Sequence, residues 1–359
     1  MNEPVKMLER YPFNGTFELT VRCNLQCKMC MLRQEERESG RLISKELSTQ
    51  QWIELARQVA DAGTVNLLIT GGEPMVRKDF CQIYREIYQM GFIITLYTNA
   101  TLVTDEIMQT LQKYPPHCIG ITLYGASDET YQKVCGARCF KRVLEGSRKL
   151  ATLPSVIEFR TTLIKDNVGD LESIEELVRR EFGTDVTHTD TVFRSVRDGC
   201  SNVESCRLSP EEMVDLTLKR MVEKVRGYLS DTVLQNVEFY LKKERAHCIT
   251  GNTRYSLLGC SSGMDSYTIT WEGKLIGCQL LDVFYTDAVN KGFIKAWEEY
   301  PLEVKLPPLN EECRQCSLAA TCKSCPAIRI AECGNMEGIP KYFCDIEKLI
   351  ETRKGATSR

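Results

Sequence analysis

The alternation of short apolar runs with amphipathic segments between residues 15 and 190 is the feature that most constrains how this chain can fold. Six of the runs are rich in β-branched or aromatic residues and are bounded by turn formers, which predicts strands. Those runs are TFELTV, VNLLIT, FIITLYT, CIGITLY, VIEFRTTLI and DVTHTD. The segments between them have helical spacing, as in STQQWIELARQVADAG, where Ser48 and Gln51 predict a capping box. Six strands separated by helices predict a parallel sheet with helices outside it, either an open doubly wound sheet or a partial (β/α) barrel.

The pattern changes after residue 190, which predicts a second unit. An irregular connector is followed by LSPEEMVDLTLKRMVEKV, a helix whose start is indicated by Ser209 and Glu212. Nine cysteines then fall between Cys248 and Cys344 with little apolar sequence among them, and metal binding can stabilise a unit that lacks a large core. We therefore expect a barrel domain over residues 1–205, a bridging helical region over 206–247, and a small cysteine-rich domain over 248–359 that includes a carboxy-terminal helix.

The composition disfavours several classes of function. The formal net charge is -3 and basic residues are spread along the chain, so there is no basic stripe that would neutralise a phosphate backbone. No apolar run approaches the roughly 20 residues that a membrane-spanning helix needs, and the first residues lack the hydrophobic core of a signal peptide. We therefore expect a cytoplasmic protein that binds neither nucleic acid nor a membrane.

The cysteine content favours metal over disulfide bonds. The chain has 18 cysteines and no export signal, and the cytosol keeps thiols reduced. Only three histidines are present, so mixed cysteine and histidine sites would be short of imidazole. This leaves all-thiolate zinc sites or iron–sulfur clusters.

Three of the cysteines, Cys23, Cys27 and Cys30, follow the first predicted strand with the spacing CxxxCxxC. Catalytic groups of α/β folds lie at this carboxyl end of the strands. A structural zinc ion normally takes four protein ligands, whereas three thiolates on a four-iron cluster leave one iron open for another ligand. A chance arrangement, or a zinc site completed by a distant cysteine, is the alternative.

The CxxxCxxC motif after the first strand resembles that of the radical S-adenosylmethionine (radical SAM) enzymes. The resemblance implies a partial (β/α)6 TIM-like barrel, in which the open iron of a 4Fe-4S cluster chelates the amino and carboxylate groups of S-adenosylmethionine. In that family an electron from the cluster cleaves the sulfonium to give a 5'-deoxyadenosyl radical, which abstracts hydrogen from the substrate. An electron donor such as flavodoxin or ferredoxin is then expected as a partner.

Residues at the ends of later strands resemble the cofactor-binding residues of the same family. TGGEP ends the second strand, as the family's methionine-binding GGEP does; its glycines allow close backbone approach, and Glu73 can accept a hydrogen bond from the ammonium group. Arg160 in the fifth strand could bind the cofactor carboxylate as a fixed fork, and a solvated strand-end arginine is the alternative. The residues implied to contact the cofactor are Gly71, Gly72, Glu73, Pro74, Thr98, Asn99, Thr122 and Arg160.

The carboxy-terminal cysteines resemble the SPASM domain, which follows many radical SAM enzymes and binds two auxiliary 4Fe-4S clusters. The family pattern has three residues between the last two cysteines of the dense run, and this chain has two. The resemblance assigns to the first auxiliary cluster Cys260, Cys278 and Cys325, with Cys248 as the candidate fourth ligand. It assigns to the second Cys313, Cys316, Cys322 and Cys344. Four-thiolate zinc is the alternative for this spacing.

No residue is clearly indicated as the catalytic acid, base or hydrogen donor. His188, at the end of the sixth predicted strand, is expected to face the cofactor side of a barrel, where it could act as an acid or base. Cys81 and Cys118 are expected to pack as small hydrophobic residues. Five cysteines are expected in loops or connectors, where a thiol could donate hydrogen to a substrate radical: Cys135, Cys139, Cys200, Cys206 and Cys333. We retain His188 and Cys135 as candidates.

The resemblance indicates the chemistry more clearly than the substrate. Gln279 follows Cys278 where sulfatase-maturating relatives have Asp, which disfavours that activity. Few residues precede Cys23, so a peptide substrate is expected to need a separate leader-binding protein or direct capture by the barrel. We expect modification of a ribosomally made peptide by a cross-link, a thioether or epimerisation. The alternatives are oxidation or epimerisation of a small molecule such as a sugar or aminocyclitol, and a non-catalytic iron–sulfur electron-transfer protein.

Overall fold

The computed structural model describes residues 10–34, 40–189, 191–194, 196–197, 199, 202–226, 257–258, 260–319, 322 and 324–356. The described residues divide into two compact units. Those of the first, which we call the barrel unit, lie within Glu9–Arg207 and Ser262–Lys305. Those of the second, which we call the carboxy-terminal unit, lie within Leu208–Ser261 and Leu306–Arg359.

Six parallel strands form the larger part of the sheet in the barrel unit. They are β1 (Asn14–Glu18), β2 (Asn66–Thr70), β3 (Ile93–Thr98), β4 (Cys118–Thr122), β5 (Val156–Thr162) and β6 (Val186–Thr189). Each pairs with its neighbour in chain order, and the whole sheet has the order β6-β5-β4-β3-β2-β1-β7-β8-β9. The six strands correspond to the six runs recognised in the sequence.

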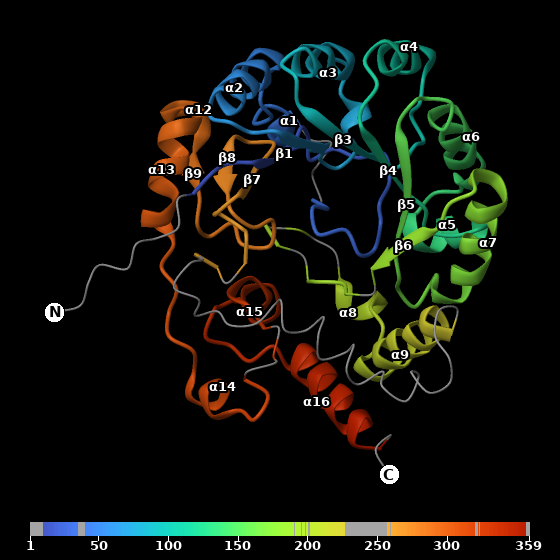
Figure 1. Cartoon of the computed structure of the whole chain (residues 1–359), viewed down its shortest axis with the longest axis vertical. Helices are drawn as coiled ribbons and strands as arrows, with labels where there is room; N and C mark the ends of the chain where they lie inside the picture. Colours follow the sequence, from blue (N-terminus) through green and yellow to red (C-terminus); the bar gives the residue numbers. More distant parts are fainter. Residues whose placement is uncertain are drawn as a thin grey trace. The chain divides into compact units, whose positions relative to one another are not determined.

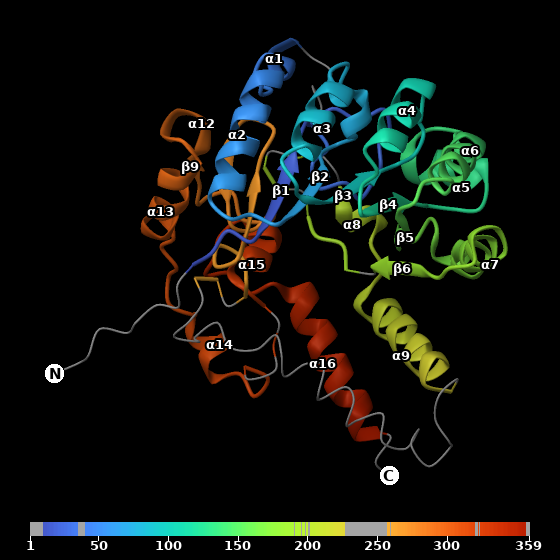
Figure 2. The same cartoon turned by 45° about the horizontal axis from the view of Figure 1, so that its top comes forward.

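At least one helix lies between each pair of these strands along the chain. The helices are α1 (Gly40–Ile43), α2 (Thr49–Asp61), α3 (Phe80–Tyr88), α4 (Asp105–Lys113), α5 (Asp128–Cys135), α6 (Phe140–Leu150) and α7 (Leu171–Phe182), with 3-10 turns η1 (Pro74–Val76) and η2 (Val168–Asp170). Figures 1 and 2 show α2, α3, α4, α6 and α7 along the outer side of the row of strands. The predicted capping box is confirmed, because the side chains of Ser48 and Gln51 each accept from the other's backbone N–H. The fold is the expected partial (β/α) barrel.

The two faces of the parallel strands have opposite chemistry. On one face, the ring of Phe17 lies 5.0 Å from that of Trp52 on α2, and the ring of Phe159 lies 4.5 Å from that of Phe182 on α7, measured between centroids. Alternate residues point to the other face, the barrel interior. At one level of the register they are Glu18, Thr70, Tyr97, Gly120 and Glu158. The helix-facing side is therefore the apolar core, and at this level the interior is polar.

A β-hairpin extends the sheet on the other side of β1. It is formed by β7 (Ser266–Ile269) and β8 (Lys274–Ile276), and it is followed by β9 (Thr286–Asp287), α12 (Ala288–Lys291) and α13 (Phe293–Glu303). Strand β7 pairs with β1 in parallel, and the hydroxyl of Tyr267 lies 2.9 Å from that of Thr64. The absence of a side chain at Gly15 makes room for Tyr267, because a Cβ there would lie 2.6 Å from its hydroxyl oxygen. Residues 262–305, which we expected in the cysteine-rich domain, therefore belong to the barrel unit.

The carboxy-terminal unit contains four described helices. They are α9 (Pro210–Arg226), α14 (Glu311–Gln315), α15 (Pro326–Cys333) and α16 (Lys341–Ala356). The predicted start of α9 is confirmed, because Ser209 N–H donates to the Glu212 carboxylate at 2.7 Å and Glu212 N–H donates to the Ser209 hydroxyl. Helices α9 and α16 pack together, and the Tyr342 hydroxyl donates to the Leu208 carbonyl at 2.9 Å. Most of the expected bridging region, from 227 to 247, lies outside the described residues.

None of the helices that the structure describes is both long enough and apolar enough to cross a membrane.

Helix α6 makes a contact that can test the packing of the barrel. A Cβ at Gly146 would lie 1.9 Å from the carbonyl oxygen of Ala100, which follows β3. We expect Gly146→Ala to lower the free energy of unfolding by about 1–3 kcal/mol, because the helix must shift away from this backbone. Thermal or urea unfolding measures the change.

Gly169→Ala is the matched control, because nothing lies within 4 Å of the added carbon and the residue is in the short η2 turn. There the substitution is expected to be neutral or mildly stabilising, since alanine restricts the unfolded chain more than glycine does. Equal unfolding midpoints for the two variants would contradict the packing described at Gly146.

Candidate functional site

The loop that carries Cys23, Cys27 and Cys30 begins a few residues after β1 and is held by the end of α5. Gln26 N–H donates to the carbonyl of Cys135 and Lys28 N–H donates to that of Val134, both at 2.9 Å. The Lys28 ammonium also donates to Asp166, after β5, at 2.8 Å. The loop is therefore fastened to two other carboxyl-edge segments of the barrel, which fixes where its cysteines lie.

The environment of Cys23 suits a thiolate bound to a cationic group. Burial raises the pKa of the Cys23 thiol, and the negative charges of Glu73 and Cys27 raise it further. The sulfur accepts from Leu25 N–H at 3.4 Å and from the Asn99 side-chain amide at 3.8 Å. A buried thiolate without a cation is unfavourable, and bound metal would offset that cost. The donor set of this loop therefore fits an iron–sulfur cluster.

The described residues contain no preformed site for a single metal ion. No group of three or more His, Cys, Asp or Glu residues within the described ranges is arranged to hold one metal ion. A four-iron cluster is larger, and each thiolate binds a different iron, so the three sulfurs need not surround one point.

The turn after β2 packs directly against the segment that leads into Cys23. Gly72 N–H donates to the Thr20 carbonyl at 2.7 Å, and Glu73 N–H donates to the Arg22 carbonyl at 2.8 Å. A Cβ at Gly72 would lie 2.2 Å from the Arg22 carbonyl oxygen, and Gly71 has φ +148°. The two glycines therefore permit a close backbone approach within the protein itself. Pro74 follows, buried, at the first position of η1.

Glu73 follows β2 and is buried next to the carboxyl end of β3. Its carboxylate accepts from Met75 N–H at 3.1 Å, from the Thr98 hydroxyl at 3.0 Å and from Asn99 N–H at 2.7 Å. A carboxylate has about four acceptor positions, so about one remains, on Oε2. Burial raises the pKa of Glu73 to about 7. The group can accept one further charged donor, which fits the ammonium of S-adenosylmethionine.

Thr98 and Asn99 lie beside Glu73 and the cysteine loop. The Asn99 side chain donates to that of Asn24 at 3.0 Å as well as to the Cys23 sulfur. The Thr98 hydroxyl, besides donating to Glu73, accepts from Ala100 N–H at 3.0 Å. Both side chains are buried. In this arrangement they support the site from within the protein, whereas the resemblance implied that they contact the cofactor.

Thr122 and Arg160 are paired in register at the ends of β4 and β5, in the barrel interior. The guanidinium carbon of Arg160 lies 4.7 Å from the centroid of the Tyr97 ring, and its Nη1 donates to the Tyr97 hydroxyl. The Arg160 side chain is 39% exposed, so part of the fork faces the open interior. The fork is available for an anion at the same edge of the sheet as Glu73.

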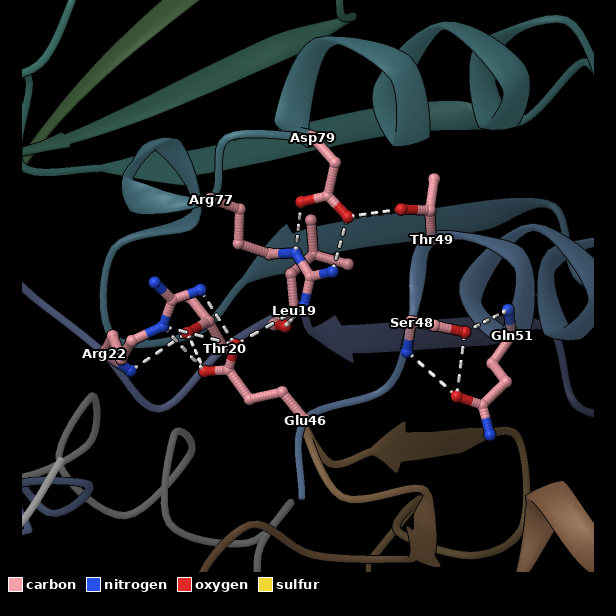
Figure 3. A network of polar contacts seen from close by, with 9 residues as sticks. All are labelled: Leu19, Thr20, Arg22, Glu46, Ser48, Thr49, Gln51, Arg77 and Asp79. Atoms are coloured by element: carbon pink, nitrogen blue, oxygen red, sulfur yellow. Dashed lines mark hydrogen bonds and ion pairs between the residues drawn. The ribbon is translucent and has the colours of Figure 1, made fainter. Parts of the chain in front are cut away.

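A buried network of charges beside the cysteine loop was not recognised in the sequence (Figure 3). Glu46 accepts from Arg22 at 2.9 Å and from the Thr20 hydroxyl, and lies 3.6 Å from Arg77. Arg77 also donates to the Leu19 carbonyl at 3.0 Å. The only signal in the sequence is that Arg22 adjoins the first motif and Arg77 follows the second. The network joins the segments that precede and follow the two motifs.

A second buried ion pair lies on the interior side of β1. Arg197, in the connector after β6, donates to both carboxylate oxygens of Glu18 at 2.6 and 3.0 Å. The two side chains are 9% and 1% exposed. Arg197 has φ +56°, and its carbonyl accepts from the Gln34 side chain at 2.6 Å. The connector that we expected to be irregular is therefore anchored inside the barrel.

The two candidates for acid, base or hydrogen donor are placed differently from the expectation. His188 pairs with Thr161, and Val186 pairs with Phe159, two residues earlier on each strand. Phe159 packs on helix α7, so His188 also faces the helices and not the barrel interior. Cys135 is the last residue of α5 and is fully buried, so it is not a loop thiol.

The other cysteines that we expected in loops also differ. Cys139 and Cys206 are buried, Cys333 lies in α15, and Cys200 lies outside the described residues. Cys118 points into the interior beside Glu158, where burial raises its pKa to about 11. It is therefore protonated at neutral pH, as a thiol packed in a polar setting.

The proposed auxiliary ligands are distributed over both units. In the carboxy-terminal unit, burial raises the pKa of the Cys344 thiol and the charges of Cys322 and Cys313 add to this. Partial burial also raises the pKa of the Cys325 thiol, and the charge of Cys260 acts in the same direction. Cys316 is exposed. Cys278 follows β8 in the barrel unit, and Cys248 lies outside the described residues.

Comparisons with known proteins agree with this geometry. The model of the radical SAM superfamily matches residues 17–178. The AdoMet-dependent heme synthase of Methanosarcina barkeri is 26% identical over 331 residues, which are 89% of this chain and 92% of that protein. The PqqA peptide cyclase of Bradyrhizobium diazoefficiens is 27% identical over 167 residues, or 46% of this chain and 43% of that protein.

A solved structure has the same fold. The crystal structure of Streptococcus suis SuiB superposes with a TM-score of 0.67 at 16% identity, covering 95% of this chain and 78% of SuiB. Structures of SuiB with S-adenosylmethionine and with its precursor peptide SuiA match similarly. The family model covers both the cysteine loop and the glycine turn that packs against it, so residues 17–178 form a radical SAM domain and the protein is a radical SAM enzyme.

Proposed function

We propose that the enzyme modifies a ribosomally made peptide by hydrogen abstraction. The observation that carries the proposal is the backbone pairing of the Gly71–Pro74 turn with the segment before Cys23, which brings the remaining acceptor position of Glu73 to the cysteine loop. The chemistry that a bound cluster and S-adenosylmethionine would supply here is reductive cleavage of the sulfonium to a 5'-deoxyadenosyl radical, which abstracts hydrogen from the substrate.

The protein's own residues would bind and orient. Cys23, Cys27 and Cys30 would hold the cluster, Glu73 would accept from the methionine ammonium, and Arg160 would pair with the methionine carboxylate. Thr122 lies in register with Arg160 and would contact the same part of the cofactor. The buried side chains of Thr98 and Asn99 would keep water away from Glu73 and Cys23.

The polar barrel interior supports a peptide over a tetrapyrrole as the substrate. Below the cofactor residues, Glu158 and Tyr97 face the interior on one wall, and the buried Glu18–Arg197 ion pair closes the other. These groups suit amide and polar side chains, whereas a flat macrocycle needs an extended apolar surface. A tetrapyrrole is the second candidate because the heme synthase is similar over most of both chains.

The carboxy-terminal cysteines would support this chemistry. In our proposal Cys313, Cys316, Cys322 and Cys344 hold one auxiliary 4Fe-4S cluster. A second is held by Cys260, Cys278 and Cys325, with Cys248 as a fourth ligand. A reduced flavodoxin or ferredoxin would supply electrons, and a separate protein would bind the leader of the peptide substrate.

The first test concerns the cysteine loop. Cys27→Ala is expected to abolish formation of 5'-deoxyadenosine, measured by chromatography after anaerobic incubation with dithionite and S-adenosylmethionine, because the cluster loses one of three thiolates. Cys81→Ala, on the outer helix α3, is the control and is expected to retain it. Cleavage by the Cys27 variant at the control rate would contradict the assignment.

The second test concerns the auxiliary sites. About twelve irons per chain are expected after full reconstitution, as three four-iron clusters require. Cys316→Ala is expected to lower the iron content by up to about four, with loss of solubility or turnover, while cluster-dependent cofactor cleavage survives. Zinc in place of the auxiliary iron, detected by elemental analysis, would refute the auxiliary clusters.

The third test uses the pKa of Glu73. Because the ammonium needs an ionised acceptor, the affinity for S-adenosylmethionine is expected to fall by up to about tenfold per pH unit as the pH drops below about 7. Glu73→Gln is expected to bind weakly with no such dependence. Glu54→Gln, on the surface of α2, should behave as the parent.

The same pKa makes a prediction for the cofactor-free protein. Between pH 4.5, the ordinary pKa, and about pH 7, Glu73 is protonated in the folded protein and ionised in the unfolded chain. The group therefore stabilises the folded state at low pH, and this contribution is lost as the pH rises through 7. Glu73→Gln should remove this pH-dependent component from urea unfolding. An unchanged pH profile in the variant would show that the pKa of Glu73 is the same in the folded and unfolded states, contrary to the expectation.

A further inference from the structure

The ring of Tyr97 crosses the neighbouring strand inside the barrel. Tyr97 on β3 pairs with Gly120 on β4, and both face the interior. A Cβ at Gly120 would lie 2.6 Å from two carbons of the Tyr97 ring, so only glycine leaves room for it. The ring therefore spans β4 and reaches toward β5.

On β5 the ring meets the guanidinium group of Arg160. The guanidinium carbon is 4.7 Å from the ring centroid, and Nη1 donates to the Tyr97 hydroxyl. The aliphatic part of the Arg160 side chain also packs over Gly120. Its Cδ lies 3.4 Å from the position that a Cβ on Gly120 would occupy. Stacking on the ring and the hydrogen bond from Nη1 together restrict rotation of the Arg160 guanidinium group. The orientation of its other N–H groups is therefore fixed.

A competing partner for the same guanidinium lies two residues away. Glu158 is on the same face of β5, and its carboxylate is 3.6 Å from Nη1 of Arg160. Both side chains are more than a third exposed, so this ion pair is screened and weak. The hydrogen bond from Nη1 to the Tyr97 hydroxyl competes with the attraction of Nη1 to the Glu158 carboxylate. Burial raises the pKa of Tyr97, so the hydroxyl is neutral at physiological pH.

We propose that Tyr97, in the space left by Gly120, is a positioning residue that holds the Arg160 fork for the methionine carboxylate of S-adenosylmethionine. The inference rests on the proposed cofactor role of Arg160 and adds to it the group that orients the fork. Arg160 is paired with Thr122 at the strand ends, and Tyr97 lies one level deeper in the register. Tyr97 therefore supports the fork from inside the barrel without itself contacting the cofactor.

The main experiment measures the dissociation constant of S-adenosylmethionine for the full-length, cluster-reconstituted enzyme under anaerobic conditions, by equilibrium dialysis. Tyr97→Phe keeps the ring and removes only the hydroxyl acceptor, and it is expected to weaken binding about fivefold. Arg160→Ala is expected to weaken it more. Tyr88→Phe, on the outer helix α3, is the matched control and should bind as the parent does.

A second ligand separates positioning from general damage to the fold. The decarboxylated analogue of S-adenosylmethionine keeps the ammonium and the sulfonium but has no carboxylate. If Tyr97 acts through the Arg160–carboxylate contact, the parent and Tyr97→Phe bind this analogue with equal affinity. A structural defect would weaken both ligands, so the difference between them isolates the proposed contact.

Removal of the competing charge provides a third measurement. Glu158→Gln in the Tyr97→Phe background is expected to restore part of the lost affinity, because the guanidinium is no longer drawn to an anion. Restoration would support the proposal, and a further loss would count against it.

The outcomes distinguish the two levels of inference. If Arg160→Ala weakens binding while Tyr97→Phe binds like the parent, the positioning role is overturned and the role of Arg160 stands. If Arg160→Ala binds like the parent, the proposed cofactor role of Arg160 is itself wrong and the inference falls with it. Equal weakening of both ligands by Tyr97→Phe would also overturn the inference.

Discussion

Two backbone hydrogen bonds hold the functional site together, and the rest of the site depends on them. They run from Gly72 N–H to the Thr20 carbonyl and from Glu73 N–H to the Arg22 carbonyl. The two backbone segments can approach this closely because Gly71 and Gly72 have no Cβ. Glu46 and Arg77 reinforce the contact from the side, since their charges are buried and satisfied by groups on both segments. The cysteine loop and the cofactor turn thus form one structural element.

The sheet around this element separates packing from chemistry by the alternation of its side chains. Residues such as Phe17 and Phe159 face the helices and supply the apolar core. Their neighbours, Glu18 and Glu158, face the interior. A change of one residue in register would exchange the two sets, so the core that stabilises the barrel also fixes which polar groups face the interior.

Much of this could be predicted from the sequence, because it depends on local patterns. The six strands and the capping residues Ser48 and Ser209 follow from spacing and residue type. The pairing of β7 with β1 could not be predicted, because it depends on a vacant position at Gly15 that a distant tyrosine fills. His188 was assigned to the interior from its place at a strand end, but its side of the sheet is set by the register with Thr161.

The site residues illustrate the same limit at closer range. Motif spacing identified Glu73 and Thr98 as neighbours of a cofactor, yet gave no sign that they bind each other. About three of the four acceptor positions of Glu73 are filled by Met75, Thr98 and Asn99, so the protein leaves about one direction for a ligand. Side chains that are already buried and hydrogen-bonded lose little conformational freedom when a ligand binds. This lowers the entropic cost of binding and so favours a higher affinity for the ligand. The residues around the motifs therefore matter mainly by restricting where the few remaining donors and acceptors can point.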